Sequence, residues 1–279
     1  MGISNLSTLS SRFGPSTKLS RHTFIDFQGI RSQAALSAVG AVAAVGVTDG
    51  NINQYVFGNQ GELLHTVIGT TAAVPLTKAG SAAGVLLAVD ATDDEGLELT
   101  PHYISASAGT LLTAFPGRFV ARTDEFYFRL KFKILTAVLG ADFIAVGFRK
   151  VETIQNVFTA YADYFALNVN NGAIRTLNEL GGAGATDTDS TQTWVNGDTH
   201  TLEVRVSSTG FARGFVDGAG LTVNPTAVYR FADGLAVMPV FHLQLDVTAL
   251  DPVITLLEWE SGLFSDRGLD NINDLTAGV

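Results

Sequence analysis

Apolar and polar side chains alternate most clearly over residues 126–134, FYFRLKFKI. Every second residue of this stretch is large and apolar, and the residues between are aromatic or basic. A period of two is typical of a β-strand with one face in a core, because a helix would scatter these side chains around its circumference. The pattern therefore predicts a strand that buries Phe126, Phe128, Leu130, Phe132 and Ile134 and turns Tyr127, Arg129, Lys131 and Lys133 to the other face.

A second stretch, residues 193–218, predicts a β-hairpin. Its first strand places Leu202, Val204 and Val206 on one face and polar residues on the other. Residues 207–210, SSTG, have the composition of a turn, and residues 211–217 return as the second strand. The dipeptide at 217–218, Asp-Gly, closes the unit as a further turn signal.

Short strand patterns separated by turn residues recur along most of the chain, and no repeat of fixed period is present. An Asn-Gly turn at residues 171–172 predicts a tight hairpin, and residues 181–189, GGAGATDTD, are interpreted as a flexible loop. The further predicted strands are residues 51–57, 62–68, 85–90, 97–104, 142–149, 164–169, 173–178, 237–246 and 253–260. This spacing favours an all-β, antiparallel β-sandwich as the fold class.

The pattern weakens at both ends, which predicts three regions: an N-terminal arm over residues 1–50, the sandwich over 51–262 and an acidic tail over 263–279. Within the arm, the apolar run at 34–47 is interpreted as a packed segment or short helix, because it is too short to span a bilayer. The rest of the arm is either a disordered tail or a segment that orders against a neighbouring subunit. Under the second reading the contact residues are Arg12, Phe13, Lys18, Arg21, Phe24, Phe27 and Arg31.

Composition excludes several functions. The net charge of −10 and a pI near 4.8 disfavour direct nucleic-acid binding, which needs clustered Lys and Arg. The chain has no cysteine, so disulfides and thiolate metal sites are excluded. The N-terminus lacks a secretory signal and a myristoylation pattern, so no membrane association is expected.

Candidate chemistry is sparse, and we predict no catalytic, cofactor-binding or metal-binding residue. Glu258 and Glu260 share one face of a strand, but without a partner carboxylate they are interpreted as a solvent-facing acidic edge. The acidic stretches 93–95 and 187–189 lack the ligand spacing of an EF-hand loop, so we interpret them as acidic surface loops, with Ca²⁺ binding as the alternative. The basic stripe formed by Arg129, Lys131 and Lys133 is either a solvated face or a docking surface for an acidic neighbour.

Five segments occur in an order that resembles virion structural proteins of tailed phages with a concanavalin-like (laminin-G-like) jelly-roll sandwich. They are FGNQGELLHTVIG, FYFRLKFKI, AVGFRKVE, TWVNGDTHTLEVRVSSTGFARGFVDG and LLEWESG. The resemblance implies a non-enzymatic capsid decoration (cement) protein on the phage head, made in the host cytoplasm. Its partners would be the major capsid protein and copies of itself, often as trimers.

The alternative is a carbohydrate-binding module of a phage fibre or tail. Sugar sites present exposed aromatic rings beside polar groups, and Trp194 and Tyr127 are the candidates here. Both aromatics also suit a structural position in a core, so the sequence leaves this alternative open.

Overall fold

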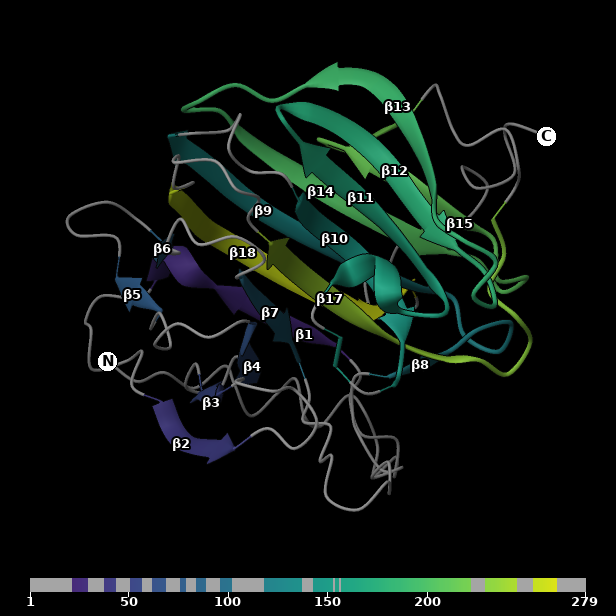
Figure 1. The fold of residues 1–279 in the computed structure, drawn as a ribbon, viewed down its shortest axis with the longest axis horizontal. Helices are drawn as coiled ribbons and strands as arrows, with labels where there is room; N and C mark the ends of the chain where they lie inside the picture. The colour runs from purple at the N-terminus through teal and green to yellow at the C-terminus, as the bar shows by residue number, and fades with distance from the viewer. Residues whose placement is uncertain are drawn as a thin grey trace, which may run out of the picture.

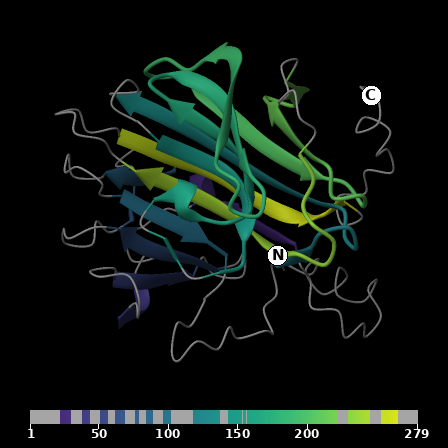
Figure 2. The same cartoon turned by 45° about the vertical axis from the view of Figure 1, so that its right-hand side comes forward.

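The fold is seen in a computed structural model, which describes the body of the chain and leaves several segments out. The described residues are 22–29, 38–43, 51–56, 62–68, 76–78, 84–88, 96–101, 118–136, 143–152, 154–155, 157–221, 229–244 and 253–264. They form two antiparallel sheets, here sheet A and sheet B, stacked as two layers (Figure 1, Figure 2). The predicted antiparallel jelly-roll β-sandwich is confirmed.

Sheet A has eight strands, and β18 runs through its middle between β9 on one side and β6 and β1 on the other (Figure 1). In sheet order they are β16 (Ala219–Gly220), β15 (Ala212–Val216), β14 (Thr199–Val206), β9 (Phe126–Thr136), β18 (Val253–Leu263), β6 (Val85–Ala88) and β5 (Thr77–Lys78). The remaining strand, β1 (Thr23–Asp26), pairs with β18 beyond the end of β6.

Sheet B has ten strands. In order they are β13 (Thr186–Thr193), β12 (Ala173–Glu179), β11 (Tyr164–Asn170), β10 (Phe143–Lys150), β17 (Ala236–Gln244), β7 (Gly96–Thr100), β4 (Glu62–Ile68), β3 (Asn51–Val56) and β2 (Ala38–Ala43). The short β8 (Phe119–Val120) also pairs with β17. Two 3₁₀ turns are described, η1 (Phe27–Gly29) and η5 (Phe158–Ala160).

The core lies between the two sheets, and β9 is its clearest contributor. All five predicted apolar residues of β9 are fully buried. The ring of Phe128 lies 4.4 Å from that of Trp259 in β18 and 6.2 Å from that of Phe148 in β10, measured between ring centroids. Because β10 belongs to the opposite sheet, Phe128 connects both layers. Burial of each such side chain contributes about 1.5–3 kcal/mol, which is why the alternation predicts the strand so reliably.

The two predicted hairpins are also present. β14 pairs with β15, and β11 pairs with β12 through a two-residue turn. In that turn Asn171 and Gly172 both have positive φ, 48° and 78°. Tight hairpin turns of this kind need positive φ at both positions, and asparagine and glycine adopt it at the least cost.

Two stretches that were not predicted as strands form edge strands of sheet B. Residues 38–43, predicted as a packed segment or short helix, form β2 at the edge of sheet B. Residues 186–189, predicted as part of a flexible loop, begin the edge strand β13. In both stretches small or polar side chains hide the period of two, because an edge strand needs less apolar surface than a central one.

Part of the predicted N-terminal arm belongs to the sandwich. Thr23–Asp26 pair with β18 in antiparallel register, from Thr23 opposite Ser261 to Asp26 opposite Glu258. The side chains of Ile25 and Phe27 are fully buried in the main core cluster. The sandwich therefore includes residues before the predicted boundary at 51, and β18 extends to Leu263, at the start of the predicted tail.

Candidate functional site

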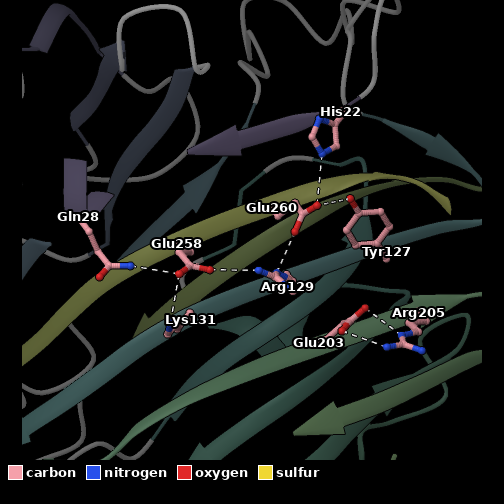
Figure 3. Close-up of polar contacts among 9 residues, drawn as sticks. All are labelled: His22, Gln28, Tyr127, Arg129, Lys131, Glu203, Arg205, Glu258 and Glu260. Carbon is pink, nitrogen blue, oxygen red and sulfur yellow. Dashed lines mark hydrogen bonds and ion pairs between the residues drawn. The ribbon is translucent and has the colours of Figure 1, made fainter. Parts of the chain in front are cut away.

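The outer face of sheet A carries a charged network built by two neighbouring strands, β9 and β18. Since β9 buries its even-numbered residues, Arg129 and Lys131 point to the outer face, opposite Glu260 and Glu258 respectively. Glu258 contacts Arg129 Nη2 and Lys131 Nζ, both at 3.1 Å. Glu260 lies 2.9 Å from Arg129 Nε and accepts a hydrogen bond of 2.7 Å from the hydroxyl of Tyr127 (Figure 3).

Two residues that flank β1 contact the same carboxylates. His22 Nε2 lies 3.4 Å from Glu260 Oε1, just before the strand, and Gln28 Nε2 donates a 3.1 Å hydrogen bond to Glu258 Oε1, just after it (Figure 3). The two carboxylates of β18 thus hold both ends of β1 while they neutralise the basic residues of β9. We call Glu258, Glu260, Arg129, Lys131 and Tyr127 the β18 network.

The β18 network answers two of the sequence predictions. Glu258 and Glu260 do not form a solvent-facing acidic edge, because β18 is an inner strand of sheet A. The acidic neighbour of the basic stripe is β18 of the same chain, at the positions of Arg129 and Lys131. Ion pairs at a protein surface contribute about 0–1 kcal/mol each, and they contribute most where several partly exposed charges form a network, as here.

A second polar cluster is buried on the outer face of sheet B. Glu98 of β7 contacts Arg149 Nη2 of β10 at 2.5 Å, accepts a 2.8 Å hydrogen bond from the Tyr161 hydroxyl and lies 3.4 Å from His242 Nδ1 of β17. The guanidinium carbon of Arg149 lies 4.3 Å from the centre of the Tyr161 ring. All four side chains are buried. We call these four residues the Glu98 cluster.

Burial and pairing act in opposite directions on the pKa of Glu98. Burial alone would raise it, because a charged carboxylate loses its hydration. The Arg149 guanidinium and the hydrogen bond from His242 outweigh burial and lower the pKa of Glu98 to about 2. Burial raises the pKa of Tyr161 well above its ordinary value, so its hydroxyl stays protonated and donates to Glu98.

The Glu98 cluster is an internal support for the segment around η5. Tyr161 follows η5, and its ring packs against Phe158, which in turn contacts His242 and Tyr164. With no member exposed, the cluster holds this segment on sheet B and offers no surface to a large substrate. Sequence reasoning missed it because Glu98 and Arg149 are 51 residues apart, and the available signal was the single charge of Glu98 inside the strand GLELT.

The aromatic residues proposed for sugar stacking are not at the surface. Trp194 and Tyr127 are both buried. Trp194 packs on Phe132, with ring centroids 4.4 Å apart, and its indole Nε1 donates to the Asp198 carbonyl at 3.3 Å. Both aromatics therefore have the structural role that the sequence left open.

Of the predicted subunit contacts, only Phe24 and Phe27 are described. Phe24 is 40% exposed, whereas Phe27 is fully buried in the chain's own core and presents no surface to a neighbour. Arg12, Phe13, Lys18, Arg21 and Arg31 lie outside the described residues. Phe24 is therefore the one described member of the set with a surface-exposed side chain.

The acidic stretch at 187–189 is used within the chain. Asp187 pairs with Arg175 Nε at 2.7 Å, and Asp189 accepts a 2.7 Å hydrogen bond from the Thr191 amide. The other stretch, residues 93–95, lies outside the described residues. Among the residues that are described, no group of three His, Cys, Asp or Glu side chains could hold a metal ion. No helix found there is long and apolar enough to cross a bilayer.

No protein-family model matches the chain, and no curated protein matches it. Among solved structures, SO2946, a protein of unknown function from Shewanella oneidensis MR-1, is 14% identical with a TM-score of 0.48, over 94% of this chain and 95% of that one. The carbohydrate recognition domain of Emp47p is 13% identical with a TM-score of 0.45, over 71% and 88% of the two chains. The family 7 alginate lyase A1-II′ is 12% identical with a TM-score of 0.43, over 75% and 82%. Values this low assign no family or ligand.

Proposed function

We propose that this chain is a non-enzymatic virion structural protein, a capsid decoration protein that binds the phage head through contacts between subunits. The observation that carries the proposal is the anchoring of the N-terminal strand. β1 is held on β18 by strand pairing, by the buried Ile25 and Phe27, and by His22 and Gln28 at its ends. The sandwich is then a stable body with a firmly attached N-terminal segment.

Anchoring matters because a segment that binds a neighbouring subunit holds the two together only if it is firmly attached to its own sandwich. The chain that precedes His22 includes Arg12, Lys18 and Arg21 and no acidic residue, in a protein of net charge −10. Such a basic segment is complementary to an acidic neighbour, including a second copy of the same chain. Surface buried between neighbours stabilises the shell by mass action.

The distribution of charged groups supports a structural role. Glu258 and Glu260, the two carboxylates that share the outer face of β18, are both engaged by Arg129, and they contact residues at both ends of β1. The burial of Trp194 and Tyr127 weighs against the carbohydrate-binding alternative, because neither ring is available to stack on a sugar.

The test is the copy number of the protein in purified particles of the phage that encodes it. Quantitative mass spectrometry should find it at a simple ratio to the major capsid protein, and particles that lack it should lose their DNA at a lower temperature. Absence from the particles, or a few copies confined to the tail, would overturn the proposal. A glycan array with the purified full chain tests the carbohydrate alternative directly.

A further inference from the structure

β1 is joined to sheet A through its pairing with β18. The edge of β18 pairs first with β6, over residues 253–256, and then with β1, over residues 258–261. Within the described part of the chain, β18 is the only strand that pairs with β1. β1 can therefore leave β18 without breaking any other described strand pair. We call the edge of β18 at residues 258–261, with the space that Ile25 and Phe27 fill, the β1 seat.

The β1 seat has the features of a binding site for a short strand. Main-chain pairing holds the strand along its length, Ile25 and Phe27 fill the apolar space, and the carboxylates of β18 bind residues just outside each end. The strand also lies at the molecular surface, since the side chain of His22 is 34% exposed and Phe24 is 40% exposed. A strand supplied from outside could reach the β1 seat from this side.

We propose that the β1 seat of one copy accepts the β1 strand of a neighbouring copy when copies are crowded together. An exchanged strand makes the same contacts as the chain's own strand, so the balance between the two states depends mainly on concentration. A short tether keeps its own strand at an effective concentration of about millimolar. Dilute protein therefore keeps its own β1, and copies packed side by side exchange it.

The inference rests on the proposed function for one condition only, namely that copies are crowded on a particle. The inference specifies which surface of a neighbouring copy the N-terminal segment contacts, namely the edge of β18. β1 lies in sheet A and β2 in sheet B, and the eight residues 30–37 join them. Eight residues span at most about 29 Å, so exchange requires the β1 seat of the neighbour to lie within roughly that distance of β2.

The absence of natural cysteines allows a direct test in the full-length protein. Thr23 and Ser261 are register partners between β1 and β18, and antiparallel partners lie within disulfide range. One chain would carry Thr23→Cys and a second chain Ser261→Cys. Residue 261 is fully buried, so random collisions form few bonds there. Thr186→Cys, at an exposed position of β13, replaces Ser261→Cys in the control mixture.

The mixtures are oxidised at about 1 µM, far below the effective concentration of a short tether, and at about 1 mM, close to it. We expect the T23C and S261C mixture at the higher concentration to give about tenfold more disulfide-linked dimer than the T23C and T186C control, and no excess at the lower one. The double variant T23C/S261C should close within one chain when dilute, which checks the geometry of the pair.

The proposal fails if the mixture at the higher concentration gives no more dimer than the control, or if the dilute double variant does not form its internal bond. Sedimentation of the unmodified chain over the same range provides a second readout, in which exchange appears as concentration-dependent association. Both measurements use purified protein, so their failure is distinguishable from absence of the protein from particles, which would overturn the proposed function instead.

Discussion

Glu98 is the residue on which the buried polar cluster depends. The pKa of Glu98 is about 2 in the folded protein, against an ordinary value of 4.5. Folding therefore favours the charged carboxylate over the protonated acid. The resulting stabilisation is fully present above pH 4.5 and is lost as the pH falls toward 2, and the difference corresponds to about 3 kcal/mol. Urea unfolding measured as a function of pH should show this loss.

Glu98→Gln provides the test of that assignment. The variant should lose about 3–5 kcal/mol at neutral pH, because Arg149 stays buried without its carboxylate, and its stability should no longer fall between pH 4.5 and 2 by the amount assigned to Glu98. Glu258→Gln, in the partly exposed β18 network, should cost only about 0–2 kcal/mol for its two ion pairs. Equal losses of unfolding free energy in the two variants would contradict the assignment of Glu98 as the buried partner of Arg149.

His65 acts in a different pH window. Burial lowers the pKa of His65 from 6.5 to about 4, because the charged imidazole would lose its hydration. Between these values the unfolded chain binds a proton that the folded chain does not, so stability should fall by about 3 kcal/mol as the pH drops from 6.5 to 4. His65→Leu should show a smaller fall over this interval in the same measurement. An unchanged slope would show that His65 is protonated in the folded state.

At the scale of elements, β9 is the strand that the sequence predicts most completely. Phe128→Asp places a charge between Trp259 and Phe148 and should prevent soluble folding, since an unpaired buried charge costs several kcal/mol. Lys131→Met, on the opposite face of the same strand, leaves Glu258 paired with Arg129 and should cost about 1 kcal/mol or less. Soluble yield and thermal unfolding measure both. A soluble, folded Phe128→Asp protein would contradict the burial of Phe128 in the core.

The N-terminal strand permits a matched pair of truncations. Removing residues 1–29 deletes β1 and its two buried anchors, Ile25 and Phe27, and should lower the free energy of unfolding by about 3–6 kcal/mol. Removing residues 1–21 keeps every described contact of β1 and should change it by less than about 0.5 kcal/mol. Guanidinium unfolding of both truncated chains gives the comparison. Equal stability of the two would show that β1 does not pair with β18 in solution.

The contrast between β9 and β1 shows how far the sequence alone could lead. Five large apolar residues at every second position specify β9 by themselves, and an Asn-Gly pair specifies the turn after β11. β1 has only four residues, and its place depends on β18, more than 230 positions later. The Glu98 cluster was missed for the same reason, because local patterns do not show which distant strands lie side by side.

Over the whole molecule, the charges are arranged differently from what the linear sequence indicated. The C-terminal end of the chain has fewer free acids than its sequence implies, because Glu258 and Glu260 are bound by Arg129, Lys131 and β1. After Glu260 the sequence contains three further acidic residues, Asp266, Asp270 and Asp274, and one basic residue, Arg267. Under the proposed function, we therefore expect charge to attract the ends of neighbouring copies only weakly and buried apolar surface to supply most of the contact.

Phe24 is the exposed apolar residue best placed to supply that burial, beside the β1 seat on the outer face. Phe24→Ser should reduce retention on particles strongly and change the stability of the free protein by no more than about 0.5 kcal/mol. Phe27→Ser is the control, because it empties a core position and should cost about 3–5 kcal/mol of stability. Sedimentation of particles across a salt series measures retention, and salt should weaken it only modestly, since screening acts on charges beyond about 8–10 Å. Full retention of the Phe24→Ser protein would show that the N-terminal strand does not anchor neighbouring subunits.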